Sequence, residues 1–313
     1  MKHGRIFLCL FACLLGAILA SPTFAAAQTK DDDDVDHRPP CRHAHAHETV
    51  TVGEYVFRAY ESADGSYDPC VLITLHGQLV RRLAKPGMEG YHLGQHADPE
   101  NKIAFLANGS DLTGEGHPDM MVRSWSGGMH CCFVNYIFEL EPKLRLIAML
   151  DDGDNALGHF EDLDHNQHYF YVTTEIWSYW PRSFASSVQH KVILRWNGKR
   201  FALALDRMQA PPPTPRQWRA AVKAVDDELK DGADPDGLGD ALWQPTLNLI
   251  YEGHPDLAWK FVREVNPKAL HQPDITLSDF CSMLKASQYW PDIKPTLQNM
   301  PETCAKAEGP TKK

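Results

Sequence analysis

The hydrophobic pattern of the chain changes at a proline-rich segment, residues 211–215, and this change limits the possible folds more than any other feature. Before the prolines, short apolar stretches are interrupted by Gly, Pro, Asp and Asn, and residues 134–140 alternate between apolar and polar, as half-buried β-strands do. After the prolines, apolar residues of segment 218–229 recur every three or four positions, which places them on one helix face. A β region is therefore followed by a helical one.

This pattern predicts an α+β chain. Strands are expected in segments 49–58, 71–75, 120–125, 133–140 and 191–205, and helices near 240–252, 255–265 and 276–288. Asn197-Gly198 between two apolar runs predicts a hairpin. The predicted parts are an antiparallel β domain of propeller-blade-like or sandwich sheets over 48–207, a Pro-rich linker over 208–215, a small α-helical domain over 216–304 and a disordered tail over 305–313.

The first 27 residues read as a cleavable signal peptide. Lys2 and Arg5 precede an apolar run over residues 6–20, and small residues close the segment. The run is shorter than the roughly 20 residues of a membrane span, so no membrane span is expected. We expect residues 28–47, which are acidic, rich in His and without periodicity, to form a disordered tail. The signal peptide predicts a periplasmic or secreted protein.

The composition is acidic. The chain has 31 basic and 41 acidic residues, and loss of Lys2 and Arg5 with the signal peptide would leave 29 basic residues and a net charge of −12. Such a surface disfavours nucleic acid and anionic membranes as partners. An envelope protein or a glycan remains as an expected partner, and the oligomeric state is open.

Eight cysteines are present, and two of them belong to the predicted signal peptide. An even number of cysteines in an oxidising compartment predicts disulfides. The six that remain are Cys41, Cys70, Cys131, Cys132, Cys281 and Cys304. Cys281 and Cys304 stand alone in the helical part, so we expect them to pair.

The adjacent Cys131 and Cys132 leave several pairings open. On a strand their side chains would point to opposite faces and could each reach one of Cys41 and Cys70. Alternatively, Cys131 and Cys132 bridge each other and Cys41 pairs with Cys70. Metal ligation by these two cysteines with His130 is a third interpretation.

Residues 111–119 have the composition of a calcium loop. Oxygen-bearing side chains stand at loop positions 1, 3, 5 and 9, namely Asp111, Thr113, Glu115 and Asp119, and Gly116 allows a sharp turn. Calcium takes several oxygen ligands from such loops. The alternative is that Asp111 and Asp119 cap a tight turn by hydrogen bonds to the backbone.

The spacing of this loop resembles the calcium loops of FG-GAP and VCBS β-propeller repeats, as in integrin α-chains, where aspartates at these positions lead into a strand. A second, more degenerate copy places Asp162, Asp164 and Asn166 at positions 1, 3 and 5. The resemblance implies structural calcium at both loops. Because propellers have at least four blades and the β region has room for two or three repeats, a full propeller is not expected.

The segment Ser126-Gly127-Gly128-Met129-His130-Cys131-Cys132 resembles segments of secreted bacterial proteins, which suggests a family but no activity. Ser126 and His130 lack a third partner and a Gly-x-Ser-x-Gly elbow. No catalytic residue is therefore predicted.

Aromatic residues are concentrated in segment 169–180. On a strand, one face would carry Tyr169, Tyr171, Trp177 and Tyr179. This face is a candidate platform for a sugar or a protein ligand. Burial between a sheet and the helices is the alternative explanation.

The first hypothesis for function is an exported, non-enzymatic binding or scaffold protein with a structural calcium loop and disulfides. The second is an envelope hydrolase with an acidic cleft formed by Asp151, Asp152, Asp154, Asp162 and Asp164. The third is a periplasmic zinc or copper binder that uses His43, His45, His47 and His130.

Overall fold

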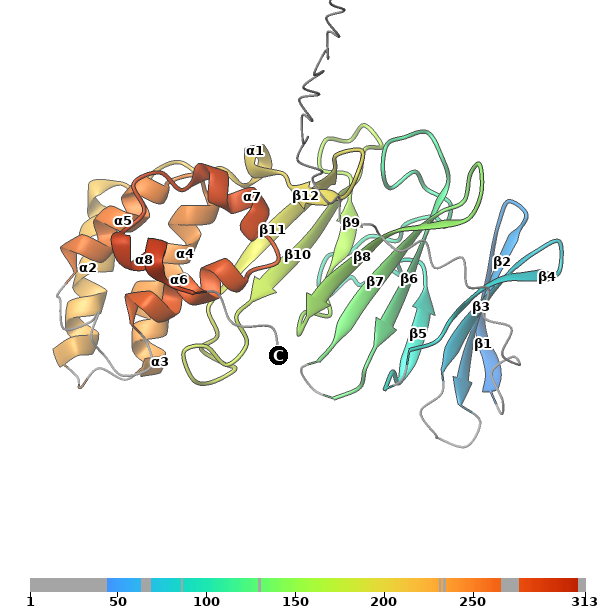
Figure 1. Cartoon of the computed structure of the whole chain (residues 1–313), viewed down its shortest axis with the longest axis horizontal. Coiled ribbons are helices and arrows are strands. Elements are labelled where there is room, and N and C mark those ends of the chain that lie inside the picture. The colour runs from blue at the N-terminus through green and yellow to red at the C-terminus, as the bar shows by residue number, and fades with distance from the viewer. Residues whose placement is uncertain are drawn as a thin grey trace, which may run out of the picture. The chain divides into compact units, whose positions relative to one another are not determined.

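The computed structural model describes residues 44–62, 69–85, 87–128, 131–230, 232, 235–265 and 276–308. The strands come first in the chain and the helices last (Figure 1). The first sheet contains β1 (Ala44–Val52), β2 (Tyr55–Ser62), β3 (Cys70–Leu75) and β4 (Gln78–Leu83). The second contains β5 (Gly90–Leu93), β6 (Asp119–Trp125), β7 (Phe133–Glu139) and β8 (Arg145–Gly153). The third contains β9 (His159–Glu161), β10 (Phe170–Ile176), β11 (Gln189–Trp196) and β12 (Phe201–Leu203).

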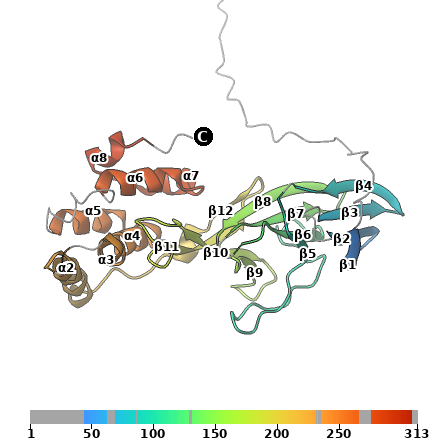
Figure 2. The same ribbon diagram turned by 90° about the horizontal axis from the view of Figure 1, so that it is seen from below.

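The helical part follows the third sheet. Its elements are α1 (Leu205–Met208), α2 (Pro215–Lys230), α3 (Pro235–Leu238), the π-helix η1 (Gly239–Trp243), α4 (Gln244–Tyr251), α5 (Pro255–Glu264), α6 (Leu277–Ala286), α7 (Trp290–Ile293), the 3-10 helix η3 (Lys294–Thr296) and α8 (Glu302–Lys306). Figure 2 shows helices α2 to α8 gathered on the far side of β10 and β11 from the first two sheets. The predicted helices near 240–252, 255–265 and 276–288 correspond to η1 with α4, to α5 and to α6.

Each sheet consists of four antiparallel strands that are neighbours in the chain, in the orders β1-β2-β3-β4, β5-β6-β7-β8 and β12-β11-β10-β9. Every pairing between these strands is antiparallel. This confirms the predicted α+β class, with antiparallel sheets followed by a smaller set of helices. The described strands form no closed barrel.

Both faces of β6 and β7, the central strands of the second sheet, are largely buried. Successive side chains of a strand point to opposite faces, and β6 divides its residues between two apolar clusters. Met120 and Val122 pack with Phe57 and other residues of the first sheet. Met121 and Ile137 pack in the other cluster, with the third sheet and the helices. The second sheet therefore lies between two cores, which explains why Met120, Met121 and Val122 of β6 are consecutive apolar residues.

Aromatic contacts join the third sheet to the helices. Trp177 and Trp180 follow β10, and their rings lie 5.3 and 6.1 Å from the ring of Phe280 on α6. Trp243 of η1 stacks on the same Phe280 ring at 5.0 Å. These buried rings supply a large apolar area. The helices therefore share one core with the third sheet.

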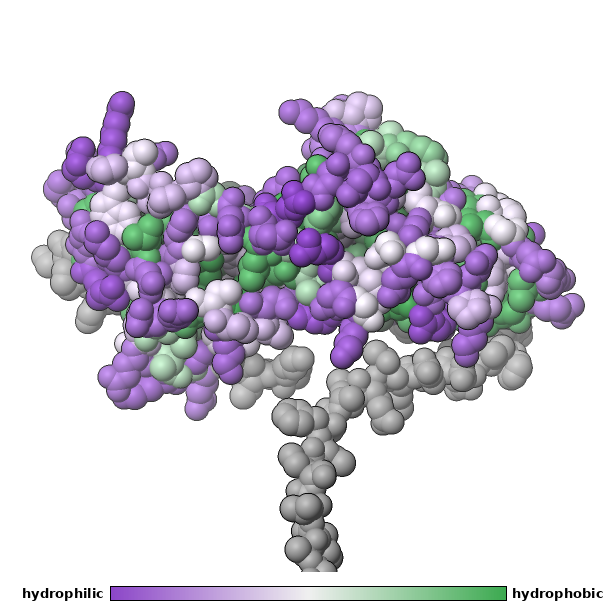
Figure 3. All heavy atoms as spheres, turned by 90° about the horizontal axis from the view of Figure 1, so that it is seen from above, coloured by the Kyte–Doolittle hydropathy of each residue, from purple (hydrophilic) through white to green (hydrophobic). Residues whose placement is uncertain are grey.

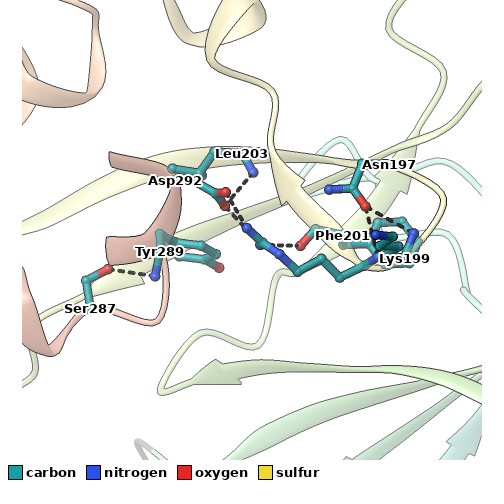
Figure 4. Close-up of polar contacts among 8 residues, drawn as sticks. Asn197, Lys199, Phe201, Leu203, Ser287, Tyr289 and Asp292 are labelled. Atoms are coloured by element: carbon teal, nitrogen blue, oxygen red, sulfur yellow. Dashed lines mark hydrogen bonds and ion pairs between the residues drawn. The ribbon is translucent and has the colours of Figure 1, made fainter. Parts of the chain in front are cut away.

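The hairpin of β11 and β12 is also tied to the helices by polar contacts (Figure 4). The Asn197 side-chain oxygen accepts the backbone N–H groups of Lys199 and Arg200 at 3.1 and 3.0 Å, which closes the predicted turn. The Arg200 guanidinium pairs with the Asp292 carboxylate on α7. The same carboxylate accepts the Leu203 N–H at 3.1 Å. Asp292 thereby fixes α7 to the end of the sheet.

Two disulfides are present among the described residues. Cys281 of α6 is bonded to Cys304 of α8, with their Cα atoms 5.0 Å apart, and this confirms the predicted pair. Cys131 is bonded to its neighbour Cys132, so the vicinal alternative is the one observed. Cys70 is disulfide-bonded as well, and Cys41 lies outside the described residues.

The N-terminal boundary of the β region differs from the prediction. Strand β1 begins at Ala44, within the segment 28–47 that was predicted to be disordered. The reason is that residues 44–46 find partners in β2, where Ala44 lies opposite Ser62. An alternating polar segment can join a sheet edge when a neighbouring strand offers hydrogen bonds.

The face of the molecule in Figure 3 is mostly hydrophilic, with apolar residues scattered between charged and polar ones. The large hydrophobic side chains exposed on the described surface are Phe105, Met149, Leu157 and Tyr179. Scattered apolar residues of this kind are ordinary on a protein surface. Among the described residues, no helix has the length and apolar character needed to cross a membrane.

Candidate functional site

A buried polar network joins the second sheet to the third, and Asp152 of β8 lies at its centre. Asp152 is 7% exposed. Its Oδ2 atom accepts hydrogen bonds from Asn135 Nδ2 at 2.8 Å and from the Tyr171 hydroxyl at 2.5 Å. Its Oδ1 atom accepts one from the Thr173 hydroxyl at 2.8 Å. Every carboxylate oxygen therefore has a protein donor, as a buried carboxylate requires.

Arg123 of β6 extends this network by hydrogen bonds to a side chain and to the backbone. Its Nε donates to Asn135 Oδ1 at 3.0 Å, and its guanidinium also donates to the carbonyls of Ala156 and Gly158. Gly158 leaves no room for a side chain, because a Cβ there would lie 2.1 Å from Asp152 Oδ2 and 2.2 Å from the Tyr171 hydroxyl. The glycine is thus required by the close approach of its backbone to the network.

A pocket of about 330 Å³ opens beside Asp152, between β8, β10 and the end of α6. Three of its lining residues carry carboxyl groups, and none of the lining residues that the structure describes is Lys, Arg or His. The lining consists of Asp151, Asp152, Gly153, Thr174, Glu175, Ile176, Trp177, Ser178, Met283, Ala286, Ser287 and Gln288. Its volume lies in the range of small-molecule sites.

Glu175 of β10 is the second buried carboxyl of the pocket. It accepts a hydrogen bond from the hydroxyl of Tyr251 on α4. Ser287 lies beside them, with its Oγ 3.4 Å from the Tyr251 hydroxyl, and it accepts the Tyr289 N–H at 3.0 Å (Figure 4). Gln288 donates to the Asp151 carbonyl at 2.9 Å and so links α6 to β8. Both the sheets and the helices therefore contribute to the pocket.

Burial controls the acid–base properties of the pocket. It raises the pKa of Asp152 to about 6, although hydrogen bonds from Tyr171 and Thr173 act in the opposite direction. Burial also raises the pKa of Glu175, against the hydrogen bonds of Ser287 and Tyr251. The pKa of Tyr289 lies well above its ordinary value because of burial and then the charge of Glu175. Desolvation disfavours the charged form in each case.

In the predicted calcium loop, residues 111–119, the carboxylates bind backbone amides. Asp111 accepts the N–H groups of Gly114, Glu115 and Gly116 at 2.7, 3.1 and 2.8 Å. Asp119 Oδ2 accepts the N–H groups of Leu112 and Thr113 at 2.8 and 3.1 Å. This is the turn-capping arrangement that the sequence analysis gives as the alternative to calcium binding.

Asp119 differs from Asp111 in its burial and in its hydrogen bonds. It is 1% exposed, and its second oxygen, Oδ1, has no hydrogen-bond partner among the described residues. Burial raises the pKa of Asp119 to about 7, against the hydrogen bonds from Leu112 and Thr113. An unpaired buried carboxylate oxygen is unfavourable unless a proton or a cation satisfies it.

The second predicted loop is also capped by its own aspartate. Asp162 accepts the N–H groups of Asn166 and Gln167 at 3.0 and 2.8 Å. Asp164 forms an ion pair with Arg207 at 2.6 Å. The structure brings the two loops together, because Thr113 and Asp164 line one pocket of about 200 Å³.

The predicted aromatic platform is divided between the core and the surface. Tyr171 is 0% exposed and Trp177 is 3% exposed, so neither offers a face to a ligand. Tyr169 is half-buried in the small pocket beside Asp164, and Tyr179 is 56% exposed. Burial against the helices, the alternative explanation, describes Trp177, which contacts Phe280 of α6, whereas Tyr171 is buried between the second and third sheets.

The acids of the hydrolase hypothesis do not form one cleft. Asp151 and Asp152 line the acidic pocket, whereas the Asp154 carboxylate accepts the Ser178 hydroxyl. Asp162 and Asp164 lie in the second loop. The sequence interpretation missed Glu175, and the feature that could have indicated it is that this is the one charged residue of the strand Phe170–Ile176.

One further group of possible ligands occurs in the first two sheets. His47, Glu48 and His92 have ligand atoms within 4.8 Å of one another, and no other set of His, Cys, Asp or Glu in the described chain forms such a group. His47 belongs to the predicted transition-metal set. The His45 backbone lies in β1, and His43 and His130 lie outside the described residues.

No protein-family model, curated protein or solved structure matches this chain. Functional inference therefore depends on the chemistry of these sites.

Proposed function

We propose that this protein is an exported binding protein that holds a small organic cation in its acidic pocket. The observation that carries the proposal is the charge of the lining, whose described residues include Asp151, Asp152 and Glu175 and no basic side chain. A cation would offset the cost of keeping the two buried carboxylates, Asp152 and Glu175, in a poorly solvated space. Export is the expectation from the signal peptide.

The mixed character of the pocket supports an organic cation over a bare ion. Ile176, Trp177 and Met283 provide apolar surface, while Ser287 and Thr174 provide hydroxyls. Small-molecule sites typically combine apolar walls with a few oriented polar groups. An amine, a guanidinium or a quaternary ammonium on a small carbon skeleton fits this chemistry.

The proposal predicts how the affinity for the cation depends on pH. Because burial raises the pKa of Asp152 to about 6 and also raises the pKa of Glu175, acidification through about pH 6 protonates Asp152 and reduces the negative charge of the pocket. Loss of negative charge weakens the attraction of a cation. Affinity should therefore fall as the pH decreases from 7.5 to 5.

Calorimetric titration with a panel of amines, guanidinium compounds and choline, each beside a neutral analogue of similar size, tests the proposal. Glu175→Gln should weaken binding of the best cation by at least about tenfold, as loss of one well-paired charge does. Glu302→Gln removes the same charge at an exposed ion pair and is the matched control. Equal binding of the cations and their neutral analogues would exclude the proposal.

A hydrolase is the second candidate. Two buried carboxyls with raised pKa values in one pocket favour it, because such groups serve as general acids near neutral pH. If the protein hydrolyses a cationic ester, amide or glycoside and Glu175→Gln abolishes this activity, the protein is a hydrolase and not only a binding protein.

We also propose a structural calcium ion at residues 111–119. The resemblance to FG-GAP and VCBS loops supports it, and so does the unpaired Asp119 Oδ1 at loop position 9. Extracellular calcium modules bind in the 10⁻⁴ to about 10⁻³ M range, which suits an exported protein.

A further inference from the structure

The group formed by His47, Glu48 and His92 connects two sheets. His47 and Glu48 lie on β1 of the first sheet, and His92 lies on β5 of the second. Their ligand atoms all lie within 4.8 Å of one another. Ligand atoms around one zinc ion lie about 3–4 Å apart, because each bond is about 2.0–2.2 Å long. Small side-chain rotations are therefore sufficient to bring the three onto one ion.

A β-bulge explains how two consecutive residues can both face β5. Ala46 lies opposite Tyr60 and Glu48 lies opposite Ala59, which leaves His47 as the extra residue. In a regular strand, neighbours point to opposite faces. A bulge breaks this alternation and redirects a side chain. His47 consequently contacts the Tyr91 carbonyl and Glu48 contacts the Leu93 amide, both on β5.

These contacts orient the ligands. His47 Nε2 lies 3.1 Å from the Tyr91 carbonyl oxygen, and because a carbonyl only accepts, Nε2 carries the proton. The lone pair of the neutral ring is then on Nδ1. Glu48 Oε2 is fixed by the Leu93 N–H at 2.8 Å. Metal-binding histidines commonly donate their other ring N–H to a carbonyl in this way.

The surroundings of His47 Nδ1 favour a cation. The atom lies 3.8 Å from a carboxylate oxygen of Glu61 on β2, which is too far for a hydrogen bond. A lone pair facing a carboxylate is electrostatically unfavourable without a positive charge nearby.

A candidate fourth ligand, the third imidazole, lies next to the group. His96 Nε2 donates to Glu48 Oε1 at 3.1 Å. Its side chain is 64% exposed and can rotate toward an ion. Imidazoles with one carboxylate form a donor set that suits zinc and copper, whereas calcium takes oxygen ligands.

We propose that His47, Glu48 and His92, with His96 available as a fourth ligand, form a zinc-type transition-metal site that cross-links β1 to β5. The site is separate from the acidic pocket and from the loop at residues 111–119. The bound ion would tie the first sheet to the second at the beginning of the described chain.

Zinc titration of the purified protein by calorimetry, with cobalt(II) as a spectroscopic substitute, tests this proposal. We expect one zinc per chain and visible absorption bands of tetrahedral cobalt. His92→Ala and Glu48→Gln should each weaken zinc binding by at least about tenfold. His76→Ala is the matched control, since His76 faces Glu54 at 3.4 Å on an exposed turn. Unchanged melting of the metal-free variants would show that they fold.

Two results would overturn the proposal. If a His43→Ala/His45→Ala double variant loses zinc while His92→Ala retains it, the N-terminal histidines hold the metal. If the protein takes up no stoichiometric zinc, the group is a set of hydrogen bonds between the two sheets and not a metal site.

Discussion

Two buried aspartates, Asp152 and Asp119, differ in how their carboxylate oxygens are hydrogen-bonded. Asp152 lies in the network between the second and third sheets, where Asn135, Tyr171 and Thr173 supply donors to both of its oxygens. Asp119 lies at the base of the loop 111–119, where one oxygen accepts three hydrogen bonds and the other has no described partner.

By this difference, Asp152 has a structural role, whereas Asp119 needs a further partner for its unpaired oxygen. Burial raises the pKa of both groups, to about 6 for Asp152 and about 7 for Asp119. Asp152 is satisfied within the protein, so its removal should damage the fold. Asp119 is incompletely satisfied, so a proton or a cation should stabilise it.

The largest effect is expected from Asp152→Ala. The substitution leaves the donors of Asn135, Tyr171 and Thr173 unpaired in the core, and each buried unsatisfied group costs about 1–3 kcal/mol. We expect a loss of about 3–5 kcal/mol in the free energy of unfolding, measured by urea denaturation. Asp151→Ala, at the exposed neighbouring position, should change it by less than about 0.5 kcal/mol. Equal effects of the two substitutions would contradict the structural role of Asp152.

Much of the fold could be predicted because its determinants are local. The alternation of β7, the Asn197-Gly198 turn and the helical period of α2 each occur within one element. The short strand β5 has only four residues, which is too few to show a period. Burial of both faces of the second sheet depends on contacts with two other sheets, and no single strand carries that information.

The sites were harder to predict than the fold. The acids at 151 and 152 could be identified from their local concentration, but Glu175 acquires its role from Tyr251 on a helix far along the chain. In the same way, His47 could be identified from the alternating histidines, whereas His92 reaches it only through the pairing of sheets. Spacing in the sequence reports neighbours on one element and not across elements.

The next effect concerns pH and Asp119. A carboxyl whose pKa is raised on folding contributes most stability at low pH, and that stability is lost as the pH rises from about 4 to about 7. Asp119→Asn removes the charge, although its amide leaves one buried donor unpaired. We expect the variant to be about 1–2 kcal/mol more stable than the wild type at pH 7.5 without calcium, and no more stable at pH 5. Superimposable pH profiles from urea denaturation would contradict this.

Calcium provides the third test. If the ion satisfies Asp119, calcium at ten times its dissociation constant should raise the free energy of unfolding by about 1.4 kcal/mol at pH 7.5. Thermal and urea melts measure the shift, which Asp119→Asn should abolish and Glu302→Gln should leave intact. A calcium shift that persists in Asp119→Asn would place the ion elsewhere in the chain.

The smallest effect distinguishes a cap from a ligand at Asp111. Asp111→Ala removes the acceptor of three backbone amides, but the loop is accessible and water can replace it, so we expect a loss of about 1 kcal/mol without calcium. If Asp111 is also a calcium ligand, the cost should grow in saturating calcium, because the variant loses the ion as well. If the cost is the same with and without calcium, Asp111 acts only as a turn cap, and the loop resembles the Asp152 network in being satisfied by the protein itself.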